Sequence, residues 1–572
     1  MEALHSPLSA RRLAVAVITS AVCACTLLPM QVDRSATAPA LSGYGRSDMA
    51  IATASDPARR HFAQGMEQAY AFNEVEAVRA FKAALAQDPG CAMCAWGVAY
   101  QLGPNINDTD RGDLTEAIRY VALAQRASAS NASPRDRDLI DALALRYGRG
   151  AADPREAAVL AAPVCGTSGG GEKADPLDVA YAGRMRVLVD RYPADADVLS
   201  MYAEAEMIAT RADYWWDPTT GQPAGRIGDV ARRLEGLLAR QPQHVGLNHY
   251  LIHAVDALAV AARAEAAADR LGALAPASPH LLHMPAHTYV QLGRYADASR
   301  VNERALAADD AQDAELARQG FKPTKDWRNH DAQFLWYAAL MEGRGELALQ
   351  TARTSAARAK GESEFAEFAR SRPLLTLLRL ERWDDVLAEP PVAGTKGVAA
   401  LLGDYARGVA SARSGRAAQS AEALARVEPA ADKLIAAQSG DDYRAKTLRA
   451  IAAVAQQRLR AEAALADGRG DVAIAAQRQA IALGKDIDEA EPPLMAAGSR
   501  LALGDIELRA KRWAEAEKTF RTDLAEHPKS GWARRGLALS LRAQGRDAEA
   551  NAIRDELRRD WAGADPLLLA GL

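Results

Sequence analysis

Apolar and polar positions follow the period of an α-helix along most of this 572-residue chain. Ala, Leu, Arg and Glu are abundant and runs of β-branched residues are few, a composition typical of helices. The pattern is interrupted where Gly, Pro, Ser and Asn gather, or where no period is visible. It predicts an all-α protein with connecting segments at residues 31–55, 130–176, 213–225, 309–327 and 388–396.

A repeat with the period of a helical hairpin divides much of the helical part into similar units. In the first unit a Gly, an Ala, a Phe and a Pro follow one another at offsets of 12, 4 and 8 residues, and this skeleton returns near the end. Its residues are Gly65, Ala77, Phe81 and Pro89 in the first unit, and Gly504, Ala516, Phe520 and Pro528 in the later one. The skeleton resembles a tetratricopeptide (TPR) unit, a helix–turn–helix of about 34 residues. The resemblance implies a TPR-type helical-hairpin solenoid, wound as a right-handed superhelix.

The length of the chain bears on its division into domains, because one compact core does not usually serve 572 residues. The helical pattern and its interruptions predict four parts. They are a signal- or lipoprotein-like segment at 1–30, a linker at 31–55, an N-terminal and central TPR solenoid at 56–388, and a C-terminal helical or TPR region at 396–572.

The N-terminal segment is typical of an export signal. Arg11 and Arg12 precede an apolar run at 13–30. Cys25 resembles the modified cysteine of a bacterial lipoprotein, although Cys23, two positions before it, departs from the usual pattern. An uncleaved membrane anchor is the other interpretation. We therefore expect an exported protein, periplasmic or lipid-anchored to the envelope, that meets a membrane only through this segment.

Charge excludes one class of partner. The chain has 70 Lys and Arg against 74 Asp and Glu, a net charge of −4 with both signs interspersed. A basic surface of the size that nucleic acids need is absent from this pattern, so we expect no nucleic-acid partner.

Two consecutive repeat units carry the same pair of histidines. His249 and His253 lie in NHYLIHAV, and His283 and His287 lie one full repeat later in LLHMPAHTYV. A spacing of four residues places both imidazoles of a pair on one face of a helix. Stacked units would bring the two faces together, which favours a binding site for a metal ion or an anionic ligand.

The TPR resemblance extends this cluster, because positions 2, 5 and 9 of the first helix line the concave groove in TPR proteins. The paired histidines occupy positions 5 and 9, His280 and His330 fall at position 2, and Glu204 falls at position 9 of the preceding unit. Neutral imidazoles suit zinc, copper, iron or nickel, and spacing does not choose among these metals. The metal ligands under this hypothesis are His249, His253, His280, His283, His287, His330 and Glu204.

Three interpretations of the histidines remain open at this point. The first is a concave groove that binds a protein or peptide partner, the usual role of a solenoid. The second is a metal-binding protein or metalloenzyme centred on His249, His253, His283 and His287, with Glu204 as the base if the metal keeps an open position. The third is core packing. A Ser-His-Asp arrangement, a phosphate-binding Gly loop and HExxH are absent, so no catalytic residue is assigned and enzymatic activity stays open.

Several longer blocks resemble a family of exported bacterial TPR proteins. The blocks are NHYLIHAV, HMPAHTYVQLGRYADA and FLWYAALMEGR, and further blocks near the start, in the middle and near the end extend the resemblance over nearly the whole chain after the signal. In this family the segment before FLW carries two histidines; the first corresponds to His330 and the second is replaced by Gln333. The family is named for its repeats and not for a reaction, so the resemblance implies a fold more than a function.

Two further features carry chemistry. Cys91 and Cys94 form a C-x-x-C at the start of a helix, which suits a disulfide in an exported protein or a redox pair. With Cys165 as the third cysteine after the signal, this is no disulfide framework. Trp215 and Trp216 lie in the aromatic loop at 213–225, where they either cover a ligand pocket or anchor the loop.

Overall fold

The computed structural model describes residues 32–566 and Leu568, except 108, 110–111, 150–173, 211, 213, 219, 324–325 and 497. The predicted signal at 1–30 and Cys165 lie outside these residues. Within the described part of the chain, no helix is long and apolar enough to cross a membrane.

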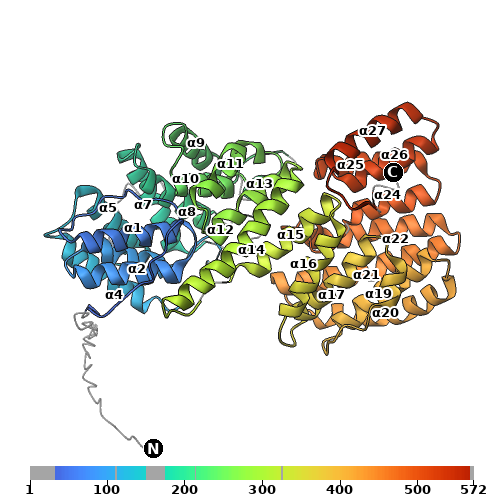
Figure 1. The fold of residues 1–572 in the computed structure, drawn as a ribbon, viewed down its shortest axis with the longest axis horizontal. Helices are drawn as coiled ribbons and strands as arrows, with labels where there is room; N and C mark the ends of the chain where they lie inside the picture. The colour runs from blue at the N-terminus through green and yellow to red at the C-terminus, as the bar shows by residue number, and fades with distance from the viewer. Residues whose placement is uncertain are drawn as a thin grey trace, which may run out of the picture.

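The described residues form helices without a strand, and one isolated bridge joins Trp216 to Pro223. Consecutive helices pair as hairpins that stack side by side (Figure 1). The prediction of an all-α, TPR-type helical-hairpin solenoid is thereby confirmed.

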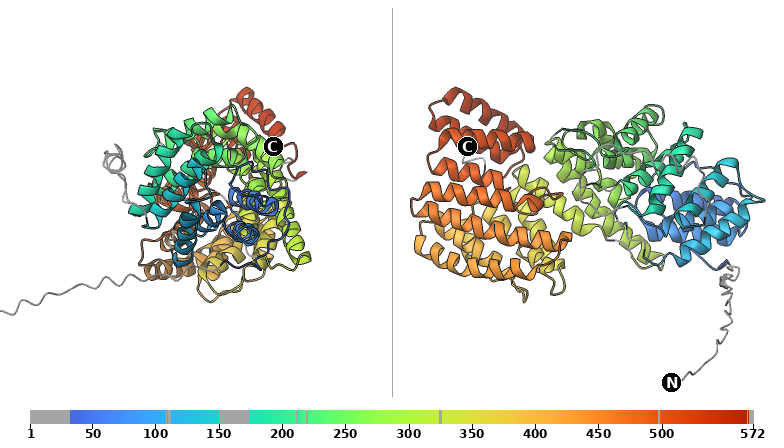
Figure 2. Two further views of the ribbon diagram at one scale, coloured as in Figure 1. Left: turned by 90° about the vertical axis from the view of Figure 1, so that its left-hand side faces the viewer. Right: turned by 180° about the vertical axis from the view of Figure 1, so that it is seen from behind.

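The molecule has two halves, which Figures 1 and 2 show along its longest axis. The N-terminal half contains α1 (Asp56–Tyr70), α2 (Glu74–Gln87), α3 (Ala92–Gln101), α4 (Thr115–Ser128), α5 (Pro134–Arg146), α7 (Pro176–Arg191), α8 (Ala196–Ala209), α9 (Ile227–Leu238), α10 (Val245–Ala254), the 3-10 helix η1 (Ala261–Ala264), α11 (Glu265–Leu274), α12 (Pro279–His283), α13 (Pro285–Gln291) and α14 (Tyr295–Arg318). Between the halves lies α15 (Arg328–Met341). The C-terminal half contains α16 (Gly345–Arg358), α17 (Glu364–Arg379), α18 (Trp383–Ala388), α19 (Val398–Arg413), α20 (Ala417–Ala437), α21 (Tyr443–Ala466), α22 (Gly470–Leu483), α23 (Lys485–Asp488), α24 (Ser499–Arg509), α25 (Trp513–Glu526), α26 (Gly531–Ala543) and α27 (Asp547–Asp560).

The last helices of the chain return to α15 and α16. Trp532 donates from its indole Nε1 to the carbonyl oxygen of Leu340 at 2.7 Å, and Trp561 donates to that of Met341 at 2.9 Å. Both rings are buried in a hydrophobic cluster that also contains Trp336. The C-terminal half is therefore fastened to the helix that carries His330.

The segment predicted as a linker at 31–55 has no helix in its described part, yet it is packed against the N-terminal half. The Tyr44 hydroxyl donates to Gln312 at 2.6 Å, and the Gly43 carbonyl oxygen accepts from the backbone of Ala277 at 2.9 Å. Gly45 has a φ of +106°, and a Cβ there would lie 2.5 Å from Val245. The segment thus belongs to the folded unit and is not a spacer.

The predicted connection at 309–327 is wrong over its first half, because α14 continues to Arg318. The polar residues Asp309 and Gln312 are buried on this helix, where a period analysis expects apolar residues. Because polar side chains lie on the inward face of α14, the hydrophobic pattern of the sequence did not indicate a helix there.

The predicted connection at 130–176 also contains a helix, α5. Ser133 accepts from the backbone of Asp136, whose side chain accepts in return from the backbone of Ser133, and Pro134 occupies the first turn. This start signal was present in the sequence and was masked by the turn-forming residues around it. Residues 150–173 lie outside the described part.

The predicted break near residue 388 coincides with the gap between α18 and α19. Leu377 and Leu401, from either side of this gap, share one hydrophobic cluster. The division into domains at 388–396 stays a prediction.

Asp309 provides a test of stability against pH. It is buried, its Oδ2 has no hydrogen-bond partner, and burial raises its pKa to about 7 although Arg328 opposes the shift. The folded state thus binds this proton more tightly than the unfolded chain, so stability is lost as pH rises from about 4 through 7. We expect Asp309→Asn to stabilise the protein, with an advantage about 2.5 kcal/mol larger at pH 8 than at pH 5. Urea denaturation at both pH values measures this. Asp310→Asn, at an exposed neighbour that pairs with Arg328, is the control; equal gains in both variants would contradict the account.

Candidate metal centre

Four helices supply the clustered histidines. His249 and His253 lie on α10, His280 and His283 on α12, His287 on α13 and His330 on α15. Pro285 lacks a backbone N–H and separates α12 from α13, so the second pair spans a break in the helix.

The six imidazoles form two triads with the same composition. The first triad is His249, His253 and His280; the second is His283, His287 and His330. Within each triad one ligand atom per residue lies within 4.8 Å of the others. Each triad combines positions 5 and 9 of one repeat unit with position 2 of the next unit. The two clusters are therefore repeats of one another, and their paired members are separated by one period of the repeat.

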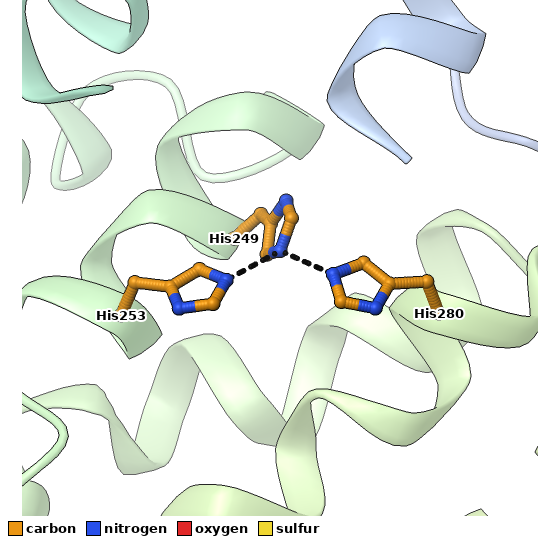
Figure 3. Close-up of side chains that lie close together, drawn as sticks. All are labelled: His249, His253 and His280. Carbon is orange, nitrogen blue, oxygen red and sulfur yellow. Dashed lines mark hydrogen bonds between the residues drawn. The ribbon is translucent and has the colours of Figure 1, made fainter. Parts of the chain in front are cut away.

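In the first triad, His249 lies between the other two imidazoles (Figure 3). The Nε2 atoms of His253 and His280 are each 3.1 Å from the Nε2 of His249. The Nδ1 of His249 is 2.8 Å from the carbonyl oxygen of Tyr70, which only accepts, so this nitrogen carries the proton. The Nε2 of His249 consequently presents a lone pair. One lone pair accepts one hydrogen bond, yet two imidazoles face it.

In the second triad, the Nε2 atoms of two histidines face each other directly. The Nδ1 of His283 donates to the Oδ1 of Asn302 at 2.7 Å, and the Nδ2 of Asn302 donates to Ala298, which fixes the amide orientation. The Nδ1 of His287 donates to Asp256 at 2.8 Å. The Nε2 atoms of His283 and His287 lie 3.0 Å apart. A contact of this kind is favourable only with a proton or a metal ion between the nitrogens.

Burial keeps five of these imidazoles neutral. It lowers the pKa of His249 to about 3 and that of His330 to about 4, and it lowers the pKa of His253, His280 and His283 as well. Neutral imidazoles are the form that binds metal ions.

His287 differs from the other five. Burial alone lowers its pKa, but the carboxylates of Asp256 and Glu491 outweigh burial and raise the pKa to about 10. The pKa of Asp256 in turn is raised to about 7 by burial and by Glu491. The bridging position between His287 and His283 is thus the most favourable place for positive charge in the cluster.

A cavity of about 420 Å³ adjoins both triads. His253 and His280 from the first triad line it, together with His287 and His330 from the second. The imidazole centres of His253 and His287 are 6.4 Å apart, and those of His280 and His283 are 6.3 Å apart. Both triads therefore reach one shared space.

Carboxylates and aromatic rings complete the cavity wall. Asp256 and Glu491 line it and form a third potential metal-binding group with His287. Trp215 and Trp327 line it as well, and the Trp327 ring stacks on His280 with centres 4.3 Å apart. The cavity thus combines metal ligands, acidic groups and flat apolar surfaces.

Three acidic residues near the histidines were not predicted from the sequence. Asp331 is fully buried with an oxygen 3.3 Å from the Nδ1 of His283, and it directly follows His330 in the sequence. Asp256 follows His253 by three residues. Their nearness to predicted ligands was an available signal. Glu491 comes from the C-terminal half and only tertiary structure places it beside His287.

The predicted ligand Glu204 is in neither triad. It lies on α8, buried, where it accepts from the hydroxyl groups of Tyr100 and Tyr250. Burial raises its pKa. Glu204 therefore acts as a hydrogen-bond acceptor for buried tyrosines, and the acidic groups at the histidines are others.

Gln333, three residues after His330 on α15, holds a segment of the C-terminal half. Its Nε2 donates to the carbonyl oxygen of Pro492 at 3.3 Å, next to Glu491. The residue thus helps to fasten the segment that brings a carboxylate to the cavity.

The two tryptophans of the aromatic loop have different roles. Trp215 lines the cavity, whereas Trp216 is buried and donates from Nε1 to the carbonyl oxygen of Ala254 at 2.7 Å. Trp216 thereby anchors the loop to the end of α10, whereas a role of Trp215 in covering a ligand stays a prediction.

Cys91 and Cys94 form a disulfide, and both side chains are fully buried. A redox pair needs accessible sulfur. The hypothesis of redox catalysis at this pair therefore has no support in the geometry.

The chain matches no protein-family model and no curated protein. It is similar to three solved structures of helical-repeat proteins, each at low identity. Cut9 in the APC/C hetero-tetramer with Hcn1 shows 11% identity and a TM-score of 0.25, covering 88% of this chain and 87% of that one. The TPR domain of P58(IPK) shows 10% identity and a TM-score of 0.21, covering 85% of this chain and 98% of that one. Yeast Tom70 shows 11% identity and a TM-score of 0.24, covering 88% of this chain and 91% of that one. Likeness at this level has no bearing on the site, and membership of the exported bacterial TPR family stays a prediction.

Proposed function

We propose that this protein binds two metal ions, one at each histidine triad, and acts as a metalloenzyme on a small substrate in the shared cavity. The observation that carries the proposal is the orientation of the imidazoles. Nε2 atoms converge throughout the first triad and between His283 and His287 of the second, while the Nδ1 atoms of His249, His283 and His287 donate to oxygen atoms behind them. Metal-binding histidines characteristically donate their second N–H in this way.

The spacing of the nitrogens supports the proposal. Imidazole nitrogen lies about 2.0–2.1 Å from zinc, so two such ligands at tetrahedral or right angles are roughly 3.0–3.4 Å apart. The observed Nε2 separations are 3.0 and 3.1 Å. An N–H can bridge one such pair of nitrogens, but in the first triad the single lone pair of His249 faces two imidazoles, and a cation would bind all three nitrogens at once.

The ligand atoms restrict the metal to four candidates and do not choose among them. All six ligands are imidazoles, which suit zinc, copper, iron or nickel. Binding at the second triad would displace the proton that His287 otherwise carries, so uptake of metal there should release a proton.

Three protein ligands leave a coordination position free for water or substrate. Such an ion supplies Lewis-acid chemistry, or redox chemistry where the metal is copper or iron. Of the groups that line the cavity, Asp256 and Glu491 are placed to accept a proton, and Trp215 and Trp327 provide flat surfaces for an apolar part of the substrate. The substrate itself is not identified by these groups.

Metal analysis tests the proposal directly. We expect two equivalents of zinc, copper, iron or nickel per chain when untagged, full-length protein, purified without chelators, is analysed by plasma mass spectrometry. The reason is that each triad offers three converging nitrogens. A folded protein that contains no metal and takes up none of these four ions would refute it.

A protein or peptide partner is the second function that we propose. The helical-hairpin solenoid favours it, because such folds present extended surfaces for partners. Four of the six clustered imidazoles are buried: His249, His280, His283 and His287. A partner would therefore bind elsewhere on the surface, and its affinity should be unchanged in a variant that has lost the histidines.

We also propose that the protein is exported, either to the periplasm or to a lipid anchor at the envelope. The signal-like sequence at 1–30 supports this, and so does the disulfide of Cys91 and Cys94, because disulfides persist in oxidising compartments. Cell fractionation with mass spectrometry of the mature N-terminus tests it. Recovery from the cytoplasm with residues 1–30 intact would contradict export.

A further inference from the structure

A second cavity lies in the C-terminal half, among α17, α19, α21, α24, α25 and α26. Its volume is about 140 Å³, and it shares no lining residue with the histidine cavity. Leu375, Val409, Met495 and Phe520 give it an apolar wall. At roughly 30 Å³ for each water molecule, a volume of this size holds about five waters, or a ligand of about six to eight non-hydrogen atoms.

Arginines and carboxylates form the polar wall of this cavity, and they are unequal in number. Each lining carboxylate already has a guanidinium partner. The pairs are Asp505 with Arg413 at 2.7 Å, Glu462 with Arg509 at 2.9 Å and Glu381 with Arg535 at 3.4 Å. The lining carboxylates are thereby neutralised, and two further cations belong to the wall: Arg458, which donates to Ser499 at 3.4 Å, and Arg379.

Arg379 ends α17, and its guanidinium lies over the ring of Trp532 at 3.8 Å. Its Nη2 is buried and has no hydrogen-bond partner. Burial lowers the pKa of this side chain to about 10, and this effect outweighs the opposite effect of Glu381, Asp523 and Asp505. Contact with a tryptophan ring offsets only part of the loss of hydration of a buried cation.

We propose that this cavity binds the carboxylate of a ligand that has an apolar stem, with the carboxylate at Arg379 and the stem beside Phe520 and Leu375. The guanidinium offers parallel N–H donors that match the two oxygens of a carboxylate. The ligand is either a free organic acid or a carboxylate of a peptide, such as a free C-terminus. The inference is independent of the metal proposal, because no group is common to both cavities.

Calorimetry on the full-length protein tests the proposal with hexanoate and hexanamide, which have the same stem and differ in charge. We expect hexanoate to bind at least about tenfold more tightly than hexanamide. Equal affinities, or no binding of hexanoate at millimolar concentration, would overturn the proposal. This comparison uses unaltered protein and does not depend on the folding of a variant.

Variants of two arginines on α17 localise the site. Arg379→Met should weaken hexanoate binding about tenfold or more, and Arg379→Lys should restore part of it. Arg372 is the matched control: it is buried on the same helix, lies over Trp336 at 5.3 Å and does not line the cavity. Arg372→Met should keep hexanoate binding. Equal losses in the two methionine variants would assign the effect to the fold and overturn the site.

The source of the carboxylate is distinguished by a short apolar peptide in two forms, with a free C-terminus and with a C-terminal amide. Binding of the free form, reduced at least about tenfold in the amide, would assign the site to peptide ends. Binding of hexanoate without binding of either peptide would assign it to free acids. Binding of both peptides alike would contradict carboxylate recognition.

Discussion

Alanine at both His253 and His287 is expected to abolish metal binding, whereas each single substitution removes one of the two ions. His253 contributes one of three nitrogens to the first triad, and His287 contributes one to the second. Two remaining imidazoles hold an ion much more weakly than three, and we expect affinity at the altered triad to fall more than about 100-fold. Plasma mass spectrometry after gel filtration counts the ions, and competition with a chelator of known affinity measures the loss.

His61 provides the control for this series. It is a half-buried histidine on α1 that belongs to neither triad, so His61→Ala should keep both ions. Circular dichroism should show unchanged helicity in every variant. Unchanged metal content in the double variant would exclude this site, and loss of both ions in either single variant would show that the triads do not act separately.

The sequence predicted the fold well because its information is periodic. Spacings of 12, 4 and 8 residues between small, aromatic and Pro positions specify a helical hairpin, and the structure contains hairpins throughout its described part. The predictions failed where polar residues are buried, as Asp309 is on α14. A hydrophobic period cannot register an inward face that is made of polar side chains.

The candidate site was predicted as one cluster, and the structure resolves it into two. Repeat positions indicated that the histidines converge, which holds for all six of them. The grouping depends on the stacking of units: His280 joins the histidines of the unit before it, as His330 does in turn. This neighbour relation follows from the packing of helices and is not written in the spacing of the histidines alone.

The positions of the acidic groups could not be predicted from the repeat pattern. Glu491 reaches His287 from the C-terminal half, far along the chain. Glu204 was predicted to join the histidines from its position in the repeat unit, but it accepts a hydrogen bond from Tyr100 instead. A position in a repeat fixes the direction of a side chain within its unit, whereas its partners depend on loops and on distant units.

The two ends of the solenoid are built on the same local packing. In each of two hairpins a buried Phe ring lies against two Gly, where a Cβ would come within 2.2 to 2.6 Å of the ring. The rings and glycines are Phe81 with Gly65 and Gly97, and Phe520 with Gly504 and Gly536. Because these glycines have no side chain, the Phe ring fits between the helices. This packing explains the spacing of Gly, Ala, Phe and Pro in the repeat.

Phe81→Ala and Phe520→Ala are therefore each expected to lower the free energy of unfolding by about 3–5 kcal/mol, since each leaves a cavity that the flanking backbone cannot fill. Urea denaturation followed by circular dichroism measures the loss. Phe520 lies in the C-terminal half, far along the chain from the triads, so Phe520→Ala should retain both metal ions under native conditions. Phe81→Leu and Phe520→Leu are the matched controls, and they should lose less because an apolar side chain remains in the space. If the free energy of unfolding falls by less than about 1 kcal/mol in the alanine variants, the helices can repack into the space of the ring, and packing of the Phe does not determine the stability of the hairpin.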